Sequence, residues 1–153
     1  MFTVDASVHV SALNPREAGS AESQAFLEQA HRLPRSGQRP LIFSPTLLLV
    51  EMAAAVTRAF DDPVRGIAMA QAVRLLPGQH WVPLDAPLAE EAIRLAAECR
   101  LRGADAVYAA VAHRYGTILV TLDQRQLERL ESVITVRRPA EALTRLATHS
   151  ESR

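Results

Sequence analysis

Short apolar runs alternate with longer amphipathic segments along this chain. The short runs predict strands at residues 2–4, 41–43, 81–84, 117–123 and 133–136. The longer segments predict helices at 18–33, 44–61, 63–76, 87–100, 104–115, 124–130 and 139–147, with a polar loop at 34–40. Strands separated by helices indicate an α/β domain with a parallel sheet covered on both faces. We assign this single domain to residues 1–148 and a short polar tail to 149–153.

Four acidic residues fall where this architecture brings elements together. Right-handed crossovers place strand C-termini and helix N-termini at one edge of the sheet, where sites form in open α/β folds. Asp5 and Asp123 end predicted strands, Asp105 opens a predicted helix, and Glu51 lies about one and a half turns into another. We therefore expect the four carboxylates to converge on one place.

Glu51 is the least ordinary of the four, because the surrounding stretch PTLLLVEMAAAV, residues 45–56, is otherwise almost entirely apolar. A helix that is apolar all round is expected to be buried. A buried carboxylate is costly unless it is paired or binds a metal ion. Arg58 is roughly 10 Å away along the same helix, so a partner must come from another element. Clustered carboxylates fit Mg²⁺ or Mn²⁺.

Simpler roles exist for the same residues. Asp5, Asp105 and Asp123 are each candidates for a helix N-cap, and Asp123 with Gln126 resembles a capping box. Two hydroxyls, Ser7 and Thr121, stand two residues from Asp5 and Asp123, where they can orient carboxylates or waters. Helix capping is an equally good interpretation of Ser7.

Composition limits the partners. The net charge is zero, so a nucleic acid would have to be held by a local patch. All seventeen basic residues are arginine, and near the acidic edge Arg58, Arg102 and Arg125 are candidates for RNA phosphate contacts, with a solvated surface role as the alternative. A single cysteine, Cys99, excludes an internal disulfide and agrees with a cytoplasmic protein. We expect no membrane span, signal peptide or zinc site.

The ordered set VDASV, LLLVEMAAAV, GADAVYAAVAHRYG and ILVTLD resembles PIN-domain nucleases, and among them the VapC-like toxin ribonucleases. The resemblance implies a three-layer α/β/α fold with a parallel sheet of about five strands. It places Asp5, Glu51, Asp105 and Asp123 on the acidic positions of the family and Thr121 on its threonine. It also implies RNA cleavage with Mg²⁺ or Mn²⁺ and inhibition by a cognate antitoxin. Because such proteins are often dimeric, a homodimer is left open.

The leading hypothesis is therefore a metal-dependent endoribonuclease that hydrolyses RNA phosphodiester bonds, the toxin of a toxin–antitoxin pair. The alternative is a non-catalytic PIN-fold module that binds RNA or protein. A phosphoacceptor domain needs a partner lysine, which the chain lacks. A DxDx[TV] phosphatase is disfavoured because Ala6 and Ser7 follow Asp5.

Overall fold

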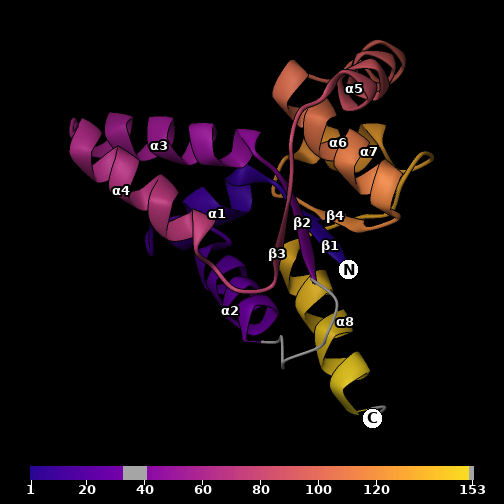
Figure 1. Cartoon of the computed structure of the whole chain (residues 1–153). Helices are drawn as coiled ribbons and strands as arrows, with labels where there is room; N and C mark the ends of the chain where they lie inside the picture. Colours follow the sequence, from indigo (N-terminus) through magenta and orange to yellow (C-terminus); the bar gives the residue numbers. More distant parts are fainter. Residues whose placement is uncertain (33–40, 152–153) are drawn as a thin grey trace.

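Five parallel strands form one central sheet in the computed structural model, which describes residues 1–32 and 41–151. Their order across the sheet is β3-β2-β1-β4-β5, and all four pairings are parallel (Figure 1). This confirms the predicted fold class. The strands are β1 (Phe2–Val4), β2 (Ile42–Pro45), β3 (Gln79–Val82), β4 (Ile118–Val120) and β5 (Val136–Arg137).

Helices connect the strands and surround the sheet. None of the helices in the described part of the chain is long and apolar enough to cross a membrane. The helices are α1 (Ala6–Ala12), α2 (Ser20–His31), α3 (Leu47–Phe60), α4 (Pro63–Arg74), α5 (Ala86–Cys99), α6 (Gly103–Tyr115), α7 (Gln124–Arg129) and α8 (Pro139–Glu151).

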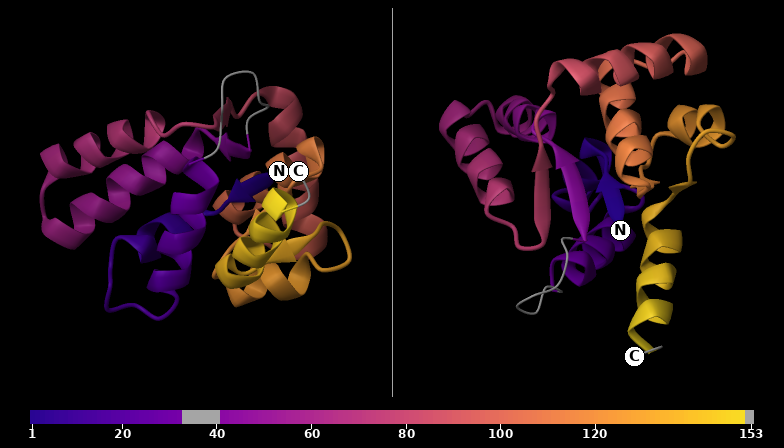
Figure 2. Two further views of the ribbon diagram at one scale, coloured as in Figure 1. Left: turned by 90° about the horizontal axis from the view of Figure 1, so that it is seen from below. Right: turned by 45° about the vertical axis from the view of Figure 1, so that its right-hand side comes forward.

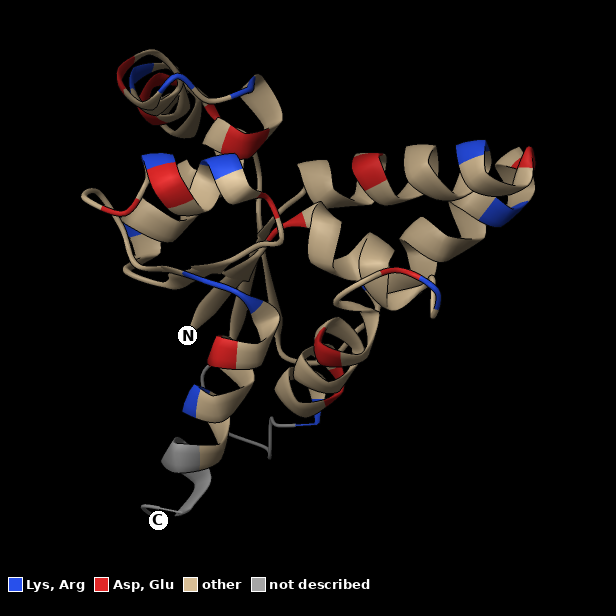
Figure 3. Ribbon diagram, turned by 180° about the vertical axis from the view of Figure 1, so that it is seen from behind, with Lys and Arg blue, Asp and Glu red and all other residues tan. Residues whose placement is uncertain are grey.

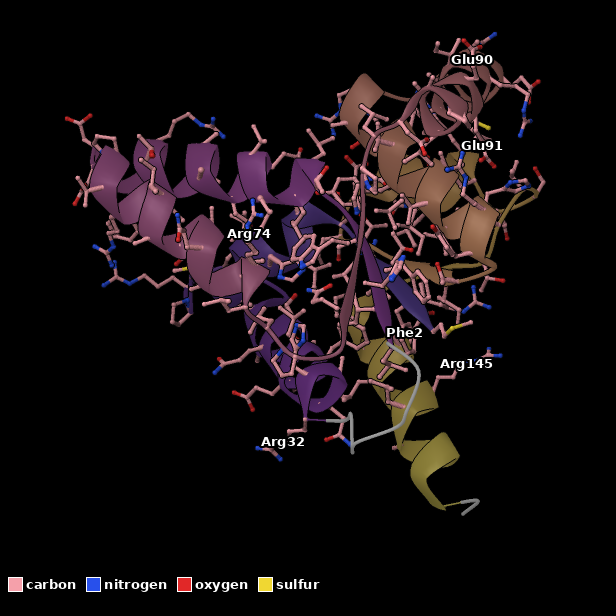
Figure 4. The ribbon with its side chains drawn as sticks, viewed as in Figure 1. Phe2, Arg32, Arg74, Glu90, Glu91 and Arg145 are labelled. Carbon is pink, nitrogen blue, oxygen red and sulfur yellow. The ribbon has the colours of Figure 1, made fainter. Side chains whose placement is uncertain are left out.

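Each face of the sheet has its own hydrophobic core, because successive strand residues point to opposite faces. On one face Phe2 and Val4 pack with Phe26 of α2 and Leu146 of α8. Figure 4 shows Phe2 beside α8. On the other face α6 packs on β1, β2 and β4, with α5 stacked against it. The views in Figure 2 place α6 and α8 on different sides of the sheet.

Several boundaries differ from the predicted ones. Helix α1 was not predicted at all, because VHVSA has no clear helical period; it follows β1 with Asp5 alone between them. The third strand begins earlier and the fifth later than expected, at Gln79 and Val136. Gly103 begins α6, although we expected it to interrupt the chain before that helix, and α8 continues past 147 to Glu151. The predicted loop at 34–40 lies outside the described residues.

Helices α3 and α4 form a hairpin that projects from the sheet (Figure 1). Gly66 allows their close approach, since a Cβ there would lie 2.6 Å from the carbonyl oxygen of Ala53. The expectation that α3 is buried all round is wrong. Its outer side is exposed, and Val50 and Phe60 are 65% and 52% accessible. The helix is apolar beyond what the core of this chain requires.

Candidate active site

The four predicted acids line a single small pocket at the carboxyl edge of the sheet. Asp5 joins β1 to α1, Glu51 lies in α3, Asp105 is in the first turn of α6, and Asp123 precedes α7. All four border a pocket of about 230 Å³, together with Ala6, Ser7, Arg102 and Ala104. Figure 3 shows red acidic segments in α3, in α6 and next to α7. The structure thus brings together side chains from four separate elements.

Asp5 is the most deeply buried of the four, with 5% of its surface accessible. Its Oδ2 accepts hydrogen bonds from the hydroxyls of Ser7 at 2.6 Å and Thr121 at 2.9 Å, and from Nε2 of Gln126 at 3.3 Å. Burial raises the pKa of Asp5, and the two hydroxyls oppose this rise. Asp5 makes no side-chain capping bond to α1, so its carboxylate points into the pocket network instead.

Glu51 is half-buried and is bound by the phenol of Tyr108, which donates to its Oε2 at 2.6 Å. Burial raises the pKa of Glu51, while the hydrogen bond from Tyr108 lowers it. Burial and the neighbouring carboxylate raise the pKa of Tyr108, which keeps the phenol protonated as a donor. The partner expected from another element is therefore a neutral hydroxyl on α6.

Asp105 and Asp123 share one arginine. Nε of Arg102 donates to Oδ2 of Asp105 at 3.0 Å, and Nη2 donates to Oδ2 of Asp123 at 2.6 Å. Asp123 also caps α7 by accepting from the backbone amides of Arg125 and Gln126. Asp105 is not a cap, because Arg102 holds the N-cap position of α6. The cap interpretation is thus correct for Asp123 and incomplete, since this carboxylate also faces the pocket.

Gln126 joins the two sides of the site and was not predicted as a site residue. It is fully buried, and its Nε2 donates to Asp5 at 3.3 Å and to Oδ1 of Asp105 at 3.2 Å. In a capping box this side chain would return to the backbone of Asp123; here it points into the acid cluster. Its position one turn into a helix after Asp123 is the sequence signal that could have identified it.

The hydroxyls of Ser7 and Thr121 both contact the carboxylate of Asp5, as the predicted orienting role requires. Thr121 donates to Asp5 and accepts from the backbone amide of Asp123 at 3.0 Å. Ser7 donates to Asp5 and accepts from the amide of Leu122 at 3.2 Å. Ser7 lies inside α1 and caps no helix, so the capping alternative is wrong. The two hydroxyls link the end of β1 to the segment that follows β4.

The donor set suits a hard divalent cation, because it consists of carboxylate oxygens around one pocket. Among the described residues, Arg102 is the one cation that forms an ion pair with these four acids. Positive charge is therefore deficient at the site. Within the same part of the chain, no three acidic, histidine or cysteine side chains already stand as a preformed metal site. The residues fit the ion in chemistry, and the arrangement must tighten to hold it.

A wider groove of about 610 Å³ adjoins the acidic pocket and shares Ala6, Ser7, Glu51 and Asp123 with it. It runs along α3 past Ala54 and Ala55 to the exposed Arg58. Arg125 is exposed beside Asp123, to which it donates its backbone amide. Of the three predicted phosphate-contacting arginines, Arg58 lines the groove, Arg125 is next to Asp123 but does not line the groove, and Arg102 is engaged by the acids.

Fold and pocket together define an α/β protein with a carboxylate site at the carboxyl edge of a parallel sheet. The PIN domain model matches residues 2–132. The chain belongs to the PIN domain family. A comparison with curated protein sequences found no match.

Solved structures share the fold at low sequence identity. VapC20 of Mycobacterium tuberculosis, a toxin that cleaves the sarcin–ricin loop, is similar with a TM-score of 0.67 and 17% identity over 88% of this chain and 97% of its own. A toxin–antitoxin complex from Klebsiella pneumoniae gives 0.63 and 17% over 91% and 98%. PAE2754 from Pyrobaculum aerophilum gives 0.64 and 24% over 96% and 95%. The similarity spans nearly the whole fold of each.

Proposed function

We propose that this protein is a metal-dependent endoribonuclease and the toxin of a toxin–antitoxin pair. The observation that carries the proposal is the convergence of Asp5, Glu51, Asp105 and Asp123, from four separate elements, on one pocket that opens into a groove. A purely structural role explains such an arrangement poorly. Adjacent carboxylates repel one another and lose solvation where they are partly buried, and both effects destabilise the fold. Membership of the PIN domain family and the likeness to VapC20 favour RNA as the substrate.

In this proposal the four acids hold Mg²⁺ or Mn²⁺. When bound, the cation supplies a Lewis acid that activates water and offsets the charge on the scissile phosphate. The hydroxyls of Ser7 and Thr121 fix the carboxylate of Asp5, and the phenol of Tyr108 fixes that of Glu51. Such contacts set the direction in which each carboxylate offers its oxygens.

The groove along α3 suits a single RNA strand. Its wall carries small and apolar side chains at Val50, Ala54 and Ala55, and outside the acid cluster its charged lining residues are Arg58 and Glu17. In this proposal Arg58 and Arg125 contact phosphates on the two sides of the acidic pocket. Contacts of this kind position the strand without reading its sequence.

The cognate antitoxin is the second partner that we propose. The hairpin of α3 and α4 exposes several large apolar side chains, among them Val64 at 75% and Ile67 at 59%. Surfaces of this kind are typical of protein contacts. The Klebsiella relative was solved as a toxin–antitoxin complex. Co-purification of the chain with the product of an adjacent small open reading frame tests this partner.

The nuclease proposal is tested by cleavage of total RNA in Mn²⁺. We expect the wild type to cleave and EDTA to stop it. Asp5→Asn and Asp123→Asn should each reduce the cleavage rate by more than about 100-fold, because each removes a carboxylate from the site. The matched control is Asp85→Asn, which alters another N-cap aspartate, outside the pocket.

Circular dichroism of each variant must show that it is folded. Cleavage that survives in both pocket variants would refute the proposal. RNA binding without cleavage by the wild type would instead favour the non-catalytic alternative. Cleavage equal to that of wild type in Asp85→Asn is required for the result to be specific to the pocket.

A further inference from the structure

Arg102 occupies an unusual position for a surface arginine. Its side chain is 66% accessible, yet its guanidinium spans two acids that belong to different elements, Asp105 in α6 and Asp123 before α7. Both hydrogen bonds go to carboxylates that border the acidic pocket. A guanidinium is not deprotonated in proteins, so Arg102 brings a full positive charge to these two acids.

The two carboxylates have no oxygen that is free of protein donors. Oδ1 of Asp105 accepts from Gln126, and Oδ1 of Asp123 accepts from the amides that α7 presents. Both Oδ2 atoms accept from Arg102. Gln126 donates from a buried side chain, and the α7 amides belong to the backbone. Arg102, in contrast, is an exposed, flexible side chain. Arg102 is therefore the contact that can be released most easily.

We propose that Arg102 is a built-in counterion that competes with the divalent cation for Asp105 and Asp123. In the metal-free protein its single positive charge offsets part of the negative charge of these two acids and holds α6 beside the start of α7. For the cation to bind both carboxylates, the guanidinium must leave their Oδ2 atoms. This inference rests on the proposed metal site and adds that the affinity of that site is limited by a residue of the same chain.

The same geometry distinguishes competition from a general charge effect. Arg125 is also exposed and lies beside Asp123, but it contacts that carboxylate through its backbone amide. Removing the side-chain charge of Arg125 leaves the hydrogen bond from its backbone amide to Asp123 in place. Arg102→Gln and Arg125→Gln thus remove the same charge near the same acid, and the first alone breaks the bridge.

Isothermal titration with Mn²⁺, without RNA, tests the proposal. We expect Arg102→Gln to bind Mn²⁺ at least about fivefold more tightly than Arg125→Gln. Arg102→Lys should fall between wild type and Arg102→Gln, because a lysine cannot span both carboxylates with a planar fork. In the wild type, titration with Mg²⁺ should shift the ¹⁵N resonance of Arg102 Nε. The midpoint of this shift should equal the midpoint of Mg²⁺ binding measured by calorimetry.

Equal Mn²⁺ affinity of the two glutamine variants would overturn the proposal, and so would weaker binding by Arg102→Gln or an Arg102 resonance that Mg²⁺ leaves unmoved. These readouts do not depend on catalysis. If the affinities shift as expected but the wild type cleaves no RNA, the nuclease proposal fails and the role of Arg102 stands. If the wild type cleaves and the affinities are equal, the reverse holds.

Discussion

The acid cluster contains two pairs that solve the same electrostatic problem differently. Asp5 and Glu51, the hydroxyl-bound pair, accept from Ser7, Thr121 and Tyr108 and have raised pKa values. Asp105 and Asp123, the arginine-bound pair, share the guanidinium of Arg102. Neutral donors orient a carboxylate without cancelling its charge, whereas an arginine does both.

The difference shows where a cation is most needed. The hydroxyl-bound pair carries charge that no ion pair offsets among the described residues, so it has the most to gain from a bound metal ion. The arginine-bound pair already has one cation between its two negative charges and must exchange that cation for another. The buried amide of Gln126 connects the two pairs through Asp5 and Asp105.

The largest expected effect comes from breaking this connection. In EDTA, Gln126→Glu should lower the free energy of unfolding by about 3 kcal/mol, because it replaces a buried donor with a third carboxylate facing two others. Urea denaturation measures the change. Gln124→Glu, exposed on the same helix, is the control and should change stability by less than about 0.5 kcal/mol. Equal losses would mean that the amide does not connect the pairs.

A smaller loss of stability should distinguish the hydroxyl-bound pair from the arginine-bound pair. Tyr108→Phe removes the donor to Glu51 and leaves the buried ring in place, and we expect it to cost about 1–2 kcal/mol in EDTA. Asp105→Asn weakens an ion pair with an exposed arginine, and we expect a cost of less than about 1 kcal/mol. A larger loss in Asp105→Asn than in Tyr108→Phe, measured by urea denaturation at neutral pH, would reverse the comparison.

The smallest expected effect is a pH dependence specific to the hydroxyl-bound pair. Burial raises the pKa of Asp5 above its ordinary value of 3.8. In the pH interval between 3.8 and the raised pKa, the folded protein retains a proton on Asp5 that the unfolded chain has lost. Stability contributed by Asp5 therefore falls as pH rises through the interval. The free energy of unfolding of metal-free wild type, relative to Asp5→Asn, should decrease as pH rises.

This measurement needs the subtraction because His9 acts in the opposite direction. Burial lowers the pKa of His9 to about 3, so below pH 6.5 the unfolded chain takes up a proton that the folded chain refuses. Proton uptake by His9 in the unfolded chain lowers the stability of the fold as pH falls from 6.5 towards 3. It is present in both proteins and cancels in the difference. A difference that is constant with pH, or that increases with it, would contradict the raised pKa of Asp5.

Sequence patterns were sufficient for the sheet and for the elements that carry the acids. Asp5 and Asp123 follow apolar strands, and Asp105 stands at the start of a helix, so the rules of parallel α/β topology place them at one edge. Strand ends shifted because a few apolar residues next to a turn do not define where pairing stops. That Asp5, Glu51, Asp105 and Asp123 hold a metal ion stays a prediction.

The partners of the acids could not be predicted in the same way. Tyr108 meets Glu51 across 57 residues, and Gln126 meets Asp5 across 121. Local periodicity carries no information about which side chains face each other at such separations. Arg102 was predicted from its position near the acidic edge, but its engagement by two carboxylates depends on the distance between α6 and α7. These contacts follow from tertiary packing.

The single-residue joint between β1 and α1 makes the chain intolerant of insertion at this point. With Val4 in the sheet and Ala6 already helical, one added residue would turn α1 by about 100° around its axis. Val8, now fully inside the hydrophobic core, would swing away from the sheet, and the carboxylate of Asp5 would lose its direction. Homologous chains are therefore expected to vary in length elsewhere and to keep this spacing fixed.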